Sequence, residues 1–168
     1  IMKFGKPMII STGMSTVEEI DLTYEIVKDH SPGLIMMNCT SAYPPKYTDI
    51  HISFAKEMLT RYPRAIIGFS DHSPGYEVVL ASFVLGAKVI EKHITMSHEL
   101  SGPDQSVSID FHDLEKMIKQ LTNLSLALKS KKEIHPTEIE IRSWAHRSLV
   151  YNFNLRNGET LKIGDIWG

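Results

Sequence analysis

Two histidines near the ends of predicted β-strands are the residues of this chain best placed to do chemistry. His72 ends an apolar segment at 65–72, and His93 lies near the end of a second one at 88–95. The helix-sized segment between them completes a strand–helix–strand unit, whose strands lie parallel and close together. Both imidazoles would then leave the same end of the sheet, where α/β folds place metals, phosphates and catalytic groups. Two unrelated histidines, one of them a core residue, are the alternative.

A pair of imidazoles at one sheet edge predicts a divalent metal site. Imidazole binds Zn, Mn, Fe or Ni, and two histidine ligands leave positions open for substrate and water, which indicates a catalytic metal. Glu91 lies one layer below His93 on the same predicted face and could hydrogen-bond to a ligand of the metal. The histidines of polar stretches are predicted to be surface residues: His98, His112 and His135.

Other polar residues also follow the predicted strands. Tyr43, on a proline-rich loop, could contact a sugar-like substrate or simply pack, and Asp104 could bind a substrate hydroxyl or form a Pro-Asp turn. Three serines at strand ends could hold a phosphate or carboxylate with the amides of the 12–13 loop, or could be turn and cap residues: Ser11, Ser41 and Ser70.

The elements that would position these residues alternate along the chain. Nearly continuous apolar runs, typical of parallel strands buried on both faces, predict strands at 7–11, 34–40, 65–72 and 88–95. Ser15 is expected to cap the first helix, with Glu18 completing a capping box, and the helix is expected to end before Ser31. Three further helices are expected at 50–61, 76–85 and 110–129.

The parity of the strands favours one fold class. Alternate residues of each strand put apolar or small side chains low on one face and a polar residue at the carboxyl end. That pattern is typical of barrel strands with an active site at the top. The chain is therefore predicted to be α/β and to carry roughly the last four βα units of a (β/α)₈ TIM barrel. A half barrel leaves two sheet edges and an open core, and a four-stranded doubly wound domain is the competing fold.

The character of the sequence changes after the fourth helix. The expected organisation is a half barrel at 1–130, a linker at 131–145 and the truncated start of a small β-rich module at 146–168. In that last part, strand-like segments at 148–153 and 160–166 flank Asn157-Gly158, which is a strong turn signal.

Composition limits the partners of the chain. A net charge of −2 over 168 residues predicts no nucleic-acid partner, and no apolar stretch approaches the roughly 20 residues that span a bilayer. Cys39 is the single cysteine, which suits a reducing cytoplasm. Because Cys39 lies in an apolar run, a buried and inert thiol is expected rather than a nucleophile.

The motifs together resemble those of the sialic acid synthase family, which makes N-acetylneuraminate and related nonulosonic acids. They occur in the same order from about Gly5 onward: Gly5-Lys6-Pro7, Ser11-Thr12-Gly13-Met14, Cys39-Thr40-Ser41-Ala42-Tyr43-Pro44, Gly68-Phe69-Ser70-Asp71-His72, Leu85-Gly86-Ala87, Glu91-Lys92-His93-Ile94-Thr95 and Gly102-Pro103-Asp104.

The resemblance implies a (β/α)₈ barrel followed by an antifreeze-like (SAF) domain in a domain-swapped homodimer. It implies a condensation of phosphoenolpyruvate with an N-acetylated hexosamine, such as N-acetylmannosamine, in which phosphate is released. A divalent metal, Mn²⁺ or Mg²⁺, would polarise the sugar aldehyde. By motif position, the metal ligands fall on His72 and His93 and the sugar-contacting residues on Tyr43 and Asp104. The phosphoenolpyruvate-binding positions fall on Ser11, Ser41 and Ser70, of which the second is Asn in some members.

Two departures from the family pattern concern parts of its active site. The resemblance places the acidic general base, other carboxylates and a phosphate-binding lysine upstream of Ile1, and an arginine of the SAF domain downstream of Gly168. This chain alone is therefore expected to be inactive, and its own catalytic residues stay unassigned. The rival functions are another TIM-barrel metal-dependent aldolase or hydrolase, and a non-catalytic fragment. Lys88 and Lys92 have the wrong strand parity for a Schiff base, which argues against the first.

Overall fold

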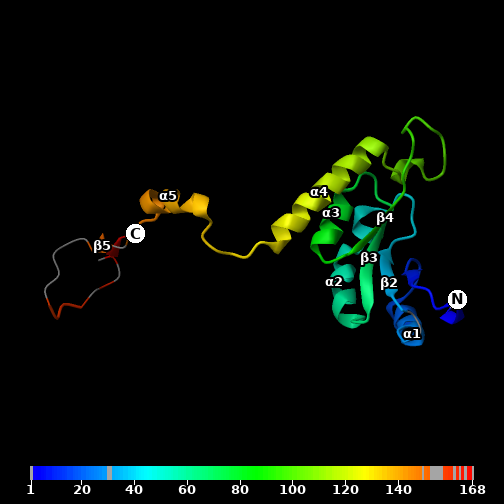
Figure 1. Cartoon of the computed structure of the whole chain (residues 1–168), viewed down its shortest axis with the longest axis horizontal. Helices are drawn as coiled ribbons and strands as arrows, with labels where there is room; N and C mark the ends of the chain where they lie inside the picture. Colours follow the sequence, from blue (N-terminus) through cyan, green and yellow to red (C-terminus); the bar gives the residue numbers. More distant parts are fainter. Residues whose placement is uncertain are drawn as a thin grey trace. The chain divides into compact units, whose positions relative to one another are not determined.

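Four parallel strands, in the order β1-β2-β3-β4, form the sheet of the computed structural model (Figure 1). The structure describes residues 2–29, 32–148, 150–151, 157–160, 162, 164 and 166–167. Two units are distinguished, Ile1–Lys129 and Ser130–Gly168. The strands of the first unit match the four expected from the apolar runs: β1 Met8–Ser11, β2 Leu34–Cys39, β3 Ala65–Asp71 and β4 Val89–Lys92.

A helix follows each strand of the first unit, as the sequence predicts. The helices are α1 Val17–Val27, α2 Ile52–Arg61, α3 Glu77–Val84 and α4 Phe111–Lys129. Short 3₁₀ turns lie at η1 Met2–Phe4, η2 Tyr47–Asp49 and η3 Gln105–Val107. The second unit contains α5 Pro136–Ala145 and the antiparallel pair of β5 Val150–Tyr151 and β6 Ile166–Trp167.

The cap of α1 lies one residue later than expected. Ser15 was predicted to cap with Glu18, but Thr16 is the cap, and Glu19 completes the box. The Thr16 side chain accepts a hydrogen bond from the Glu19 amide at 3.3 Å, while the Glu19 carboxylate accepts from the Thr16 amide at 2.8 Å. The Ser15 amide is instead bonded to the Thr12 carbonyl, which keeps Ser15 in the preceding turn. Two overlapping matches to the capping pattern made the prediction wrong by one residue.

The segment expected to be a linker contains helix α5. His135 caps it through Nδ1, Glu138 completes a capping box, and Pro136 occupies the first turn, where it needs no amide hydrogen. The Pro136 in this polar stretch is thus a helix start. Of the strand expected at 148–153, residues 150–151 form β5, whereas 148 lies outside it. In the second strand-like segment, 160–166, the described residues 160, 162 and 164 are not in a strand, and 166 begins β6. The prediction for 149, 152–153 and for 161, 163 and 165 of the second strand-like segment lies outside the described residues.

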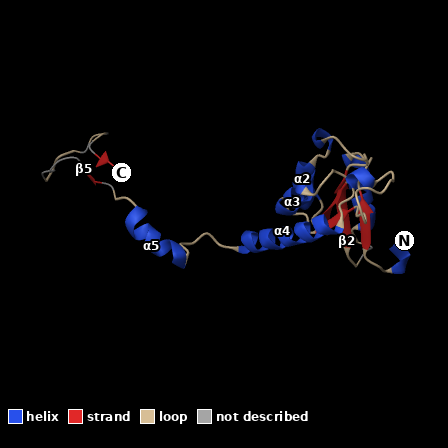
Figure 2. Ribbon diagram, turned by 90° about the horizontal axis from the view of Figure 1, so that it is seen from above, coloured by secondary structure: helices blue, strands red, loops and turns tan. Residues whose placement is uncertain are grey.

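The helices of the first unit cover one face of the sheet. In Figure 2, α2 and α3 lie to one side of the strands. The described strand residues that join the hydrophobic clusters beneath α1–α4 all belong to one face of the sheet: Met8, Ile10, Leu34, Met36, Ala65, Ile67, Phe69 and Ile90. Burying this face removes the large apolar side chains of the four strands from water, which is the main stabilising contribution to the unit.

The opposite face of the sheet is open among the described residues. Its first layer is Ile9, Ile35 and Ile66, which are register partners. Ile9 is 61% and Ile66 49% exposed. A doubly wound domain would cover both faces with helices, whereas a barrel strand turns this face toward the barrel axis. The one-sided covering therefore supports the half barrel over the competing fold.

The second layer of the open face contains a close approach between strands. Gly68 is the register partner of Met37, and a Cβ at Gly68 would lie 2.2 Å from the Met37 sulfur and 2.9 Å from the Val89 carbonyl oxygen. The absent side chain therefore lets Met37, which is 1% exposed, lie across β3. The third layer, directly above, is Cys39, Ser70 and Glu91.

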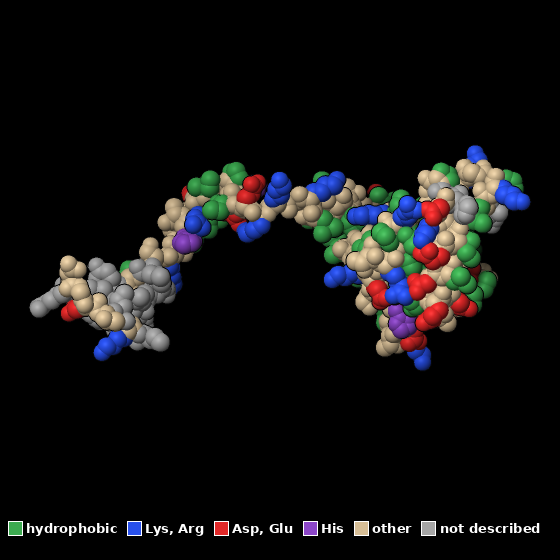
Figure 3. Space-filling view, turned by 90° about the horizontal axis from the view of Figure 1, so that it is seen from below, with side chains coloured by type: hydrophobic (Ala, Val, Ile, Leu, Met, Phe, Trp, Pro, Cys, Tyr) green, Lys and Arg blue, Asp and Glu red, His purple; other side chains and the backbone are tan. Residues whose placement is uncertain are grey.

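Charged side chains of both signs are interspersed on the face of the first unit that Figure 3 shows. Cross-element ion pairs include Arg61 with Asp21 at 2.5 Å and Arg64 with Asp29. None of the described helices combines the length and apolar character that crossing a membrane requires.

Candidate functional site

The two predicted metal ligands lie next to each other at the carboxyl ends of neighbouring strands. Asp71 and Lys92 form the last register pair of β3 and β4, and His72 and His93 directly follow them. The two ring centroids are 5.2 Å apart, and the rings meet edge to face. The two imidazoles are therefore close neighbours at this edge of the sheet.

His72 is held in the tautomer that a metal ligand needs. Its Nδ1 lies 2.8 Å from the Thr40 carbonyl oxygen. A carbonyl oxygen only accepts, so Nδ1 carries the hydrogen, and the lone pair of Nε2 stays available. Since His72 is 6% exposed, the ring has little freedom to leave this orientation. The donor set of His72 and His93 thus fits a divalent cation.

Tyr43 lies against both imidazoles. Its ring centroid is 4.2 Å from that of His72 and 5.7 Å from that of His93. Burial raises the pKa of the Tyr43 hydroxyl, and electrostatic interaction with Cys39, Asp104 and Glu91 raises it further. The phenol therefore stays protonated at neutral pH and can donate a hydrogen bond to a substrate oxygen.

Asp104 completes the group from the loop after β4. Its Oδ2 lies 3.7 Å from His93 Nδ1. The distance is too long for a good hydrogen bond, but the carboxylate faces the ring that it would orient. The two predicted sugar-contacting residues, Tyr43 and Asp104, thus both lie close to His93.

The three predicted anion-binding serines differ in their surroundings. Ser11 ends β1 and is paired with Met37, one layer below Ser70. The Ser70 hydroxyl donates to Glu91 Oε1 at 2.6 Å. Ser41 approaches the loop after β1 so closely that a Cβ at Gly13 would lie 2.2 Å from its Oγ. The loops after β1 and β2 are therefore in contact. The binding of phosphoenolpyruvate by the three serines stays a prediction.

Cys39 is less buried than its apolar run suggested. It is half-buried, on the face of the sheet that carries Ser70 and Glu91. Its Sγ lies 4.0 Å from His72 Nδ1. The expectation of a buried thiol was therefore wrong, because the strand face that carries Cys39 is not covered by helices.

A buried ion pair behind the histidines was missed by the sequence reasoning. Lys92 Nζ lies 2.8 Å from Asp71 Oδ2, and the two side chains are 3% and 1% exposed. The signal was available, since opposite charges directly precede the two histidines. Lys92 lies on the helix-facing side, as its strand parity predicts, and Lys88 lies over the Phe83 ring.

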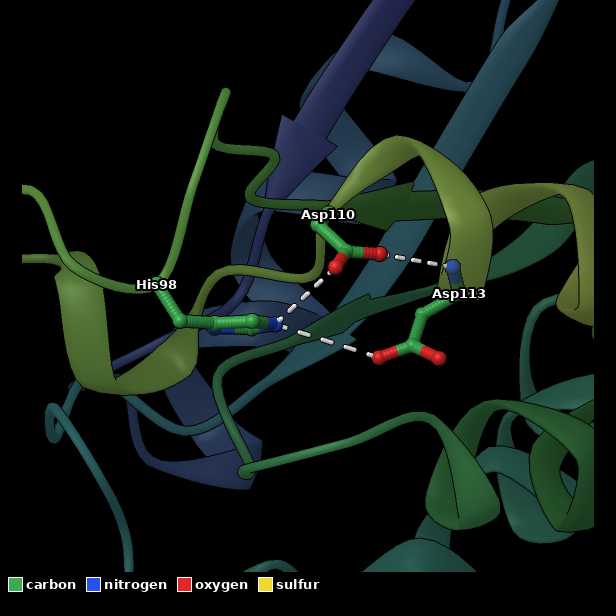
Figure 4. Close-up of side chains that lie close together, drawn as sticks. All are labelled: His98, Asp110 and Asp113. Atoms are coloured by element: carbon green, nitrogen blue, oxygen red, sulfur yellow. Dashed lines mark hydrogen bonds and ion pairs between the residues drawn. The ribbon is translucent and has the colours of Figure 1, made fainter.

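A second grouping of histidine and carboxylates lies at the start of α4 (Figure 4). His98 Nε2 is 3.6 Å from Asp110 Oδ2 and 3.9 Å from Asp113 Oδ2. Asp110 Oδ1 accepts from the Asp113 amide at 2.8 Å, so Asp110 caps the start of α4. Asp113 also pairs with Lys116 at 3.3 Å. His98 is exposed, as predicted, and this group closes the helix start.

We expect replacement of Asp110 by alanine to lower the melting temperature more at pH 7 than at pH 3. The Asp113 amide, more than the nearby His98, lowers the pKa of Asp110 below its ordinary value of 3.8. A group with a depressed pKa stabilises the fold above its unfolded value, and that contribution is lost as the pH falls through the folded value. Melting curves of both proteins at the two pH values measure the difference. A penalty of equal size at pH 3 would contradict the capping role of the charged carboxylate.

Relatives of the chain are similar over almost its whole length. An N-acetylneuraminate-9-phosphate synthase from Mus musculus is 33% identical over 162 residues, which cover 96% of this chain and 45% of the relative. An N,N'-diacetyllegionaminic acid synthase from Legionella pneumophila subsp. pneumophila is 31% identical over 166 residues, with 95% and 46% covered. The chain thus spans about half the length of the curated relatives it matches.

A solved structure shows the same fold. The crystal structure of N-acetylneuraminic acid (sialic acid) synthetase from Leptospira borgpetersenii serovar Hardjo-bovis, in complex with citrate, matches with a TM-score of 0.74 at 32% identity. The match covers 88% of this chain and 53% of that chain. The family model described as the NeuB family matches residues 1–133. The chain therefore belongs to the NeuB family.

Proposed function

We propose that this chain is part of a nonulosonic (sialic) acid synthase, which condenses phosphoenolpyruvate with an N-acetylated hexosamine and releases phosphate. The observation that carries the proposal is the convergence of His72, His93, Tyr43 and Asp104 in a chain of the NeuB family. Because the chain spans about half the length of its relatives, the activity is proposed for the natural protein as a whole. That protein is further proposed to be a cytoplasmic homodimer with a SAF domain that begins near residue 146.

His72 and His93 are the proposed ligands of one divalent metal, Mn²⁺ or Mg²⁺. Such a metal would supply Lewis-acid polarisation of the sugar aldehyde. The hydrogen bond from His72 Nδ1 to the Thr40 carbonyl supports this role, because it leaves Nε2 available and fixes the ring.

The remaining site residues have complementary proposed roles. The phenol of Tyr43 donates to the sugar, and the carboxylate of Asp104 accepts from a sugar hydroxyl. The three serines bind the phosphoenolpyruvate anion. Since the Ser70 hydroxyl donates to Glu91 at 2.6 Å, it must turn from that carboxylate to the anion when the substrate binds. The acidic general base is proposed to come from outside these residues.

A Schiff-base aldolase on the same scaffold is disfavoured by the lysines. Lys92 Nζ is bound to Asp71 and to the Ser73 carbonyl oxygen, on the side of the sheet away from the histidines. Lys88 Nζ lies 5.9 Å from the centre of the Phe83 ring. Neither amine reaches the face that carries the site.

The proposal is tested by phosphate release from phosphoenolpyruvate by the natural protein. N-acetylmannosamine and its 6-phosphate are supplied in turn, with and without Mn²⁺. The expected result is release that requires both an N-acetylated hexosamine and the metal, together with a nonulosonic acid product identified by mass spectrometry. Release that is indifferent to the sugar would overturn the proposal.

Replacing Ser11, Ser41 or Ser70 singly by alanine is expected to raise the KM for phosphoenolpyruvate by about 10- to 100-fold. Each change removes a hydrogen bond to a charged group, which contributes about 1.5–3 kcal/mol. Steady-state kinetics of the natural protein measure the change. Ser143→Ala is the control, because that hydroxyl donates to Glu140 within α5, and its KM should stay at the wild-type value. An unchanged KM in all three variants would place the anion elsewhere.

A further inference from the structure

Directly behind the two histidines, the sheet carries an ion pair where its pattern calls for apolar residues. Asp71 and Lys92 end β3 and β4 and are register partners. Their strand parity places them on the helix-facing side, above the apolar layer of Phe69 and Ile90. The two side chains are 1% and 3% exposed. A salt bridge of full charges at the top of an apolar face needs a physical reason.

The ion pair continues into a network that encloses the backbone of His72. Asp71 Oδ1 accepts from the Ser73 amide at 3.0 Å and from its hydroxyl at 2.8 Å, and Oδ2 accepts from the hydroxyl at 3.0 Å. Lys92 Nζ donates to Asp71 Oδ2 at 2.8 Å and also to the Ser73 carbonyl oxygen. Ser73 is fully buried. The residues on both sides of His72 are therefore tied to β4, the strand that leads into His93.

Stability alone does not account for this arrangement. Removing two charges from water costs about as much as their attraction returns, and apolar pairs of similar volume often stabilise as well. A hydrogen-bonded ion pair differs from an apolar pair in being directional, because it fixes the relative position of the groups that it joins. Here it joins the two strand ends that carry the imidazoles.

We propose that Asp71, Lys92 and Ser73 are positioning residues, which hold His72 and His93 at the separation that one metal ion requires. They act from the far side of the sheet and touch neither imidazole ring. The inference rests on the proposed function, since the two histidines must bind the metal for the positioning to matter. Loss of such an outer contact typically weakens metal affinity by about 10- to 100-fold.

The test compares two double variants of the natural protein that undergo the same chemical change. Asp71→Asn with Lys92→Met removes both buried charges together and leaves an oxygen for the Ser73 amide. Asp21→Asn with Arg61→Met does the same to an exposed pair, which is joined at 2.5 Å far from the histidines. Mn²⁺ binding is measured by titration calorimetry, and melting temperatures are recorded without metal. The first variant should bind Mn²⁺ about 10- to 100-fold more weakly at a nearly unchanged melting temperature, and the second should bind like wild type.

A metal-free measurement separates this inference from the proposed function. The Nδ1 hydrogen of His72, bonded to the Thr40 carbonyl, should give a slowly exchanging imidazole resonance in the wild-type protein. Its exchange should accelerate in the Asp71→Asn, Lys92→Met variant and not in the control. If wild-type protein fails to bind Mn²⁺, the proposed function fails, while this resonance still decides the positioning. Wild-type exchange and wild-type affinity in the folded variant would overturn the inference.

A milder pair of variants covers the case in which the double variant does not fold. Ser73→Ala keeps both charges and removes only the hydroxyl contacts to Asp71. Ser82→Ala is its match, because Ser82 is equally buried and its hydroxyl donates to the Val79 carbonyl at 2.8 Å. Faster exchange of the His72 hydrogen in the first variant alone supports the positioning role. Equal exchange in the two variants refutes it.

Discussion

Replacement of His72 or His93 by alanine is expected to abolish Mn²⁺ binding and to lower the rate of phosphate release about 10³-fold or more. Each change removes one of the two imidazoles whose rings lie 5.2 Å apart, and Lewis-acid polarisation is worth several kcal/mol in the transition state. Titration calorimetry and steady-state kinetics of the natural protein measure the two effects.

His98→Ala is the matched control for this prediction. His98 is also near carboxylates, at 3.6 Å from Asp110 and 3.9 Å from Asp113, and is therefore the alternative place for a cation. The variant should bind Mn²⁺ like wild type. If His98→Ala abolished binding and His72→Ala did not, the metal would belong at the start of α4 and the proposed site would be wrong.

The second large effect concerns the open face of the sheet. Expressed by itself, the 168-residue chain is expected to aggregate or to melt without a single cooperative monomeric transition. Ile9 and Ile66 are 61% and 49% exposed on a face that no described helix covers, and among the described strands β1 and β4 are each paired on one side only. Contiguous apolar surface beside unpaired strand edges drives association.

Neighbouring isoleucines provide a matched pair of variants for this expectation. Ile66→Thr should reduce light scattering of the isolated chain, because the side chain already faces water. Ile67→Thr should instead lower the stability, because Ile67 is 1% exposed beneath the helices and its new hydroxyl would lack water. A monomeric, cooperative transition of the unmodified chain would show that the open face needs no partner.

Nearly continuous apolar runs located the strands of the first unit, and apolar residues at helical spacing located its helices. Strand parity then placed His72 and His93 at one edge, and the structure brings their rings together. Both inferences depend only on local sequence and on the geometry of parallel strands.

What the sequence did not predict depends on contacts between distant segments. The Asp71–Lys92 pair was signalled by the opposite charges before the two histidines, but its burial and its hydrogen bonds depend on the register of β3 and β4. The half-burial of Cys39 follows from the absence of helices on one sheet face. The capping of α1 by Thr16 was decided by the turn that retains Ser15, since the local pattern allowed both.

The glycine in the second layer of the open face determines which side chain lies beneath the polar residues of the site. Because Gly68 has no side chain, the layer under Ser70 is a thioether that reaches across from β2. Thioethers are flexible and polarisable, so they change shape at little cost. Cys39, Ser70 and Glu91, in the layer above, are held by the pairing of their strands, whereas the Met37 side chain beneath them can change its conformation. The layer beneath the polar groups can therefore change its shape without any movement of the strands.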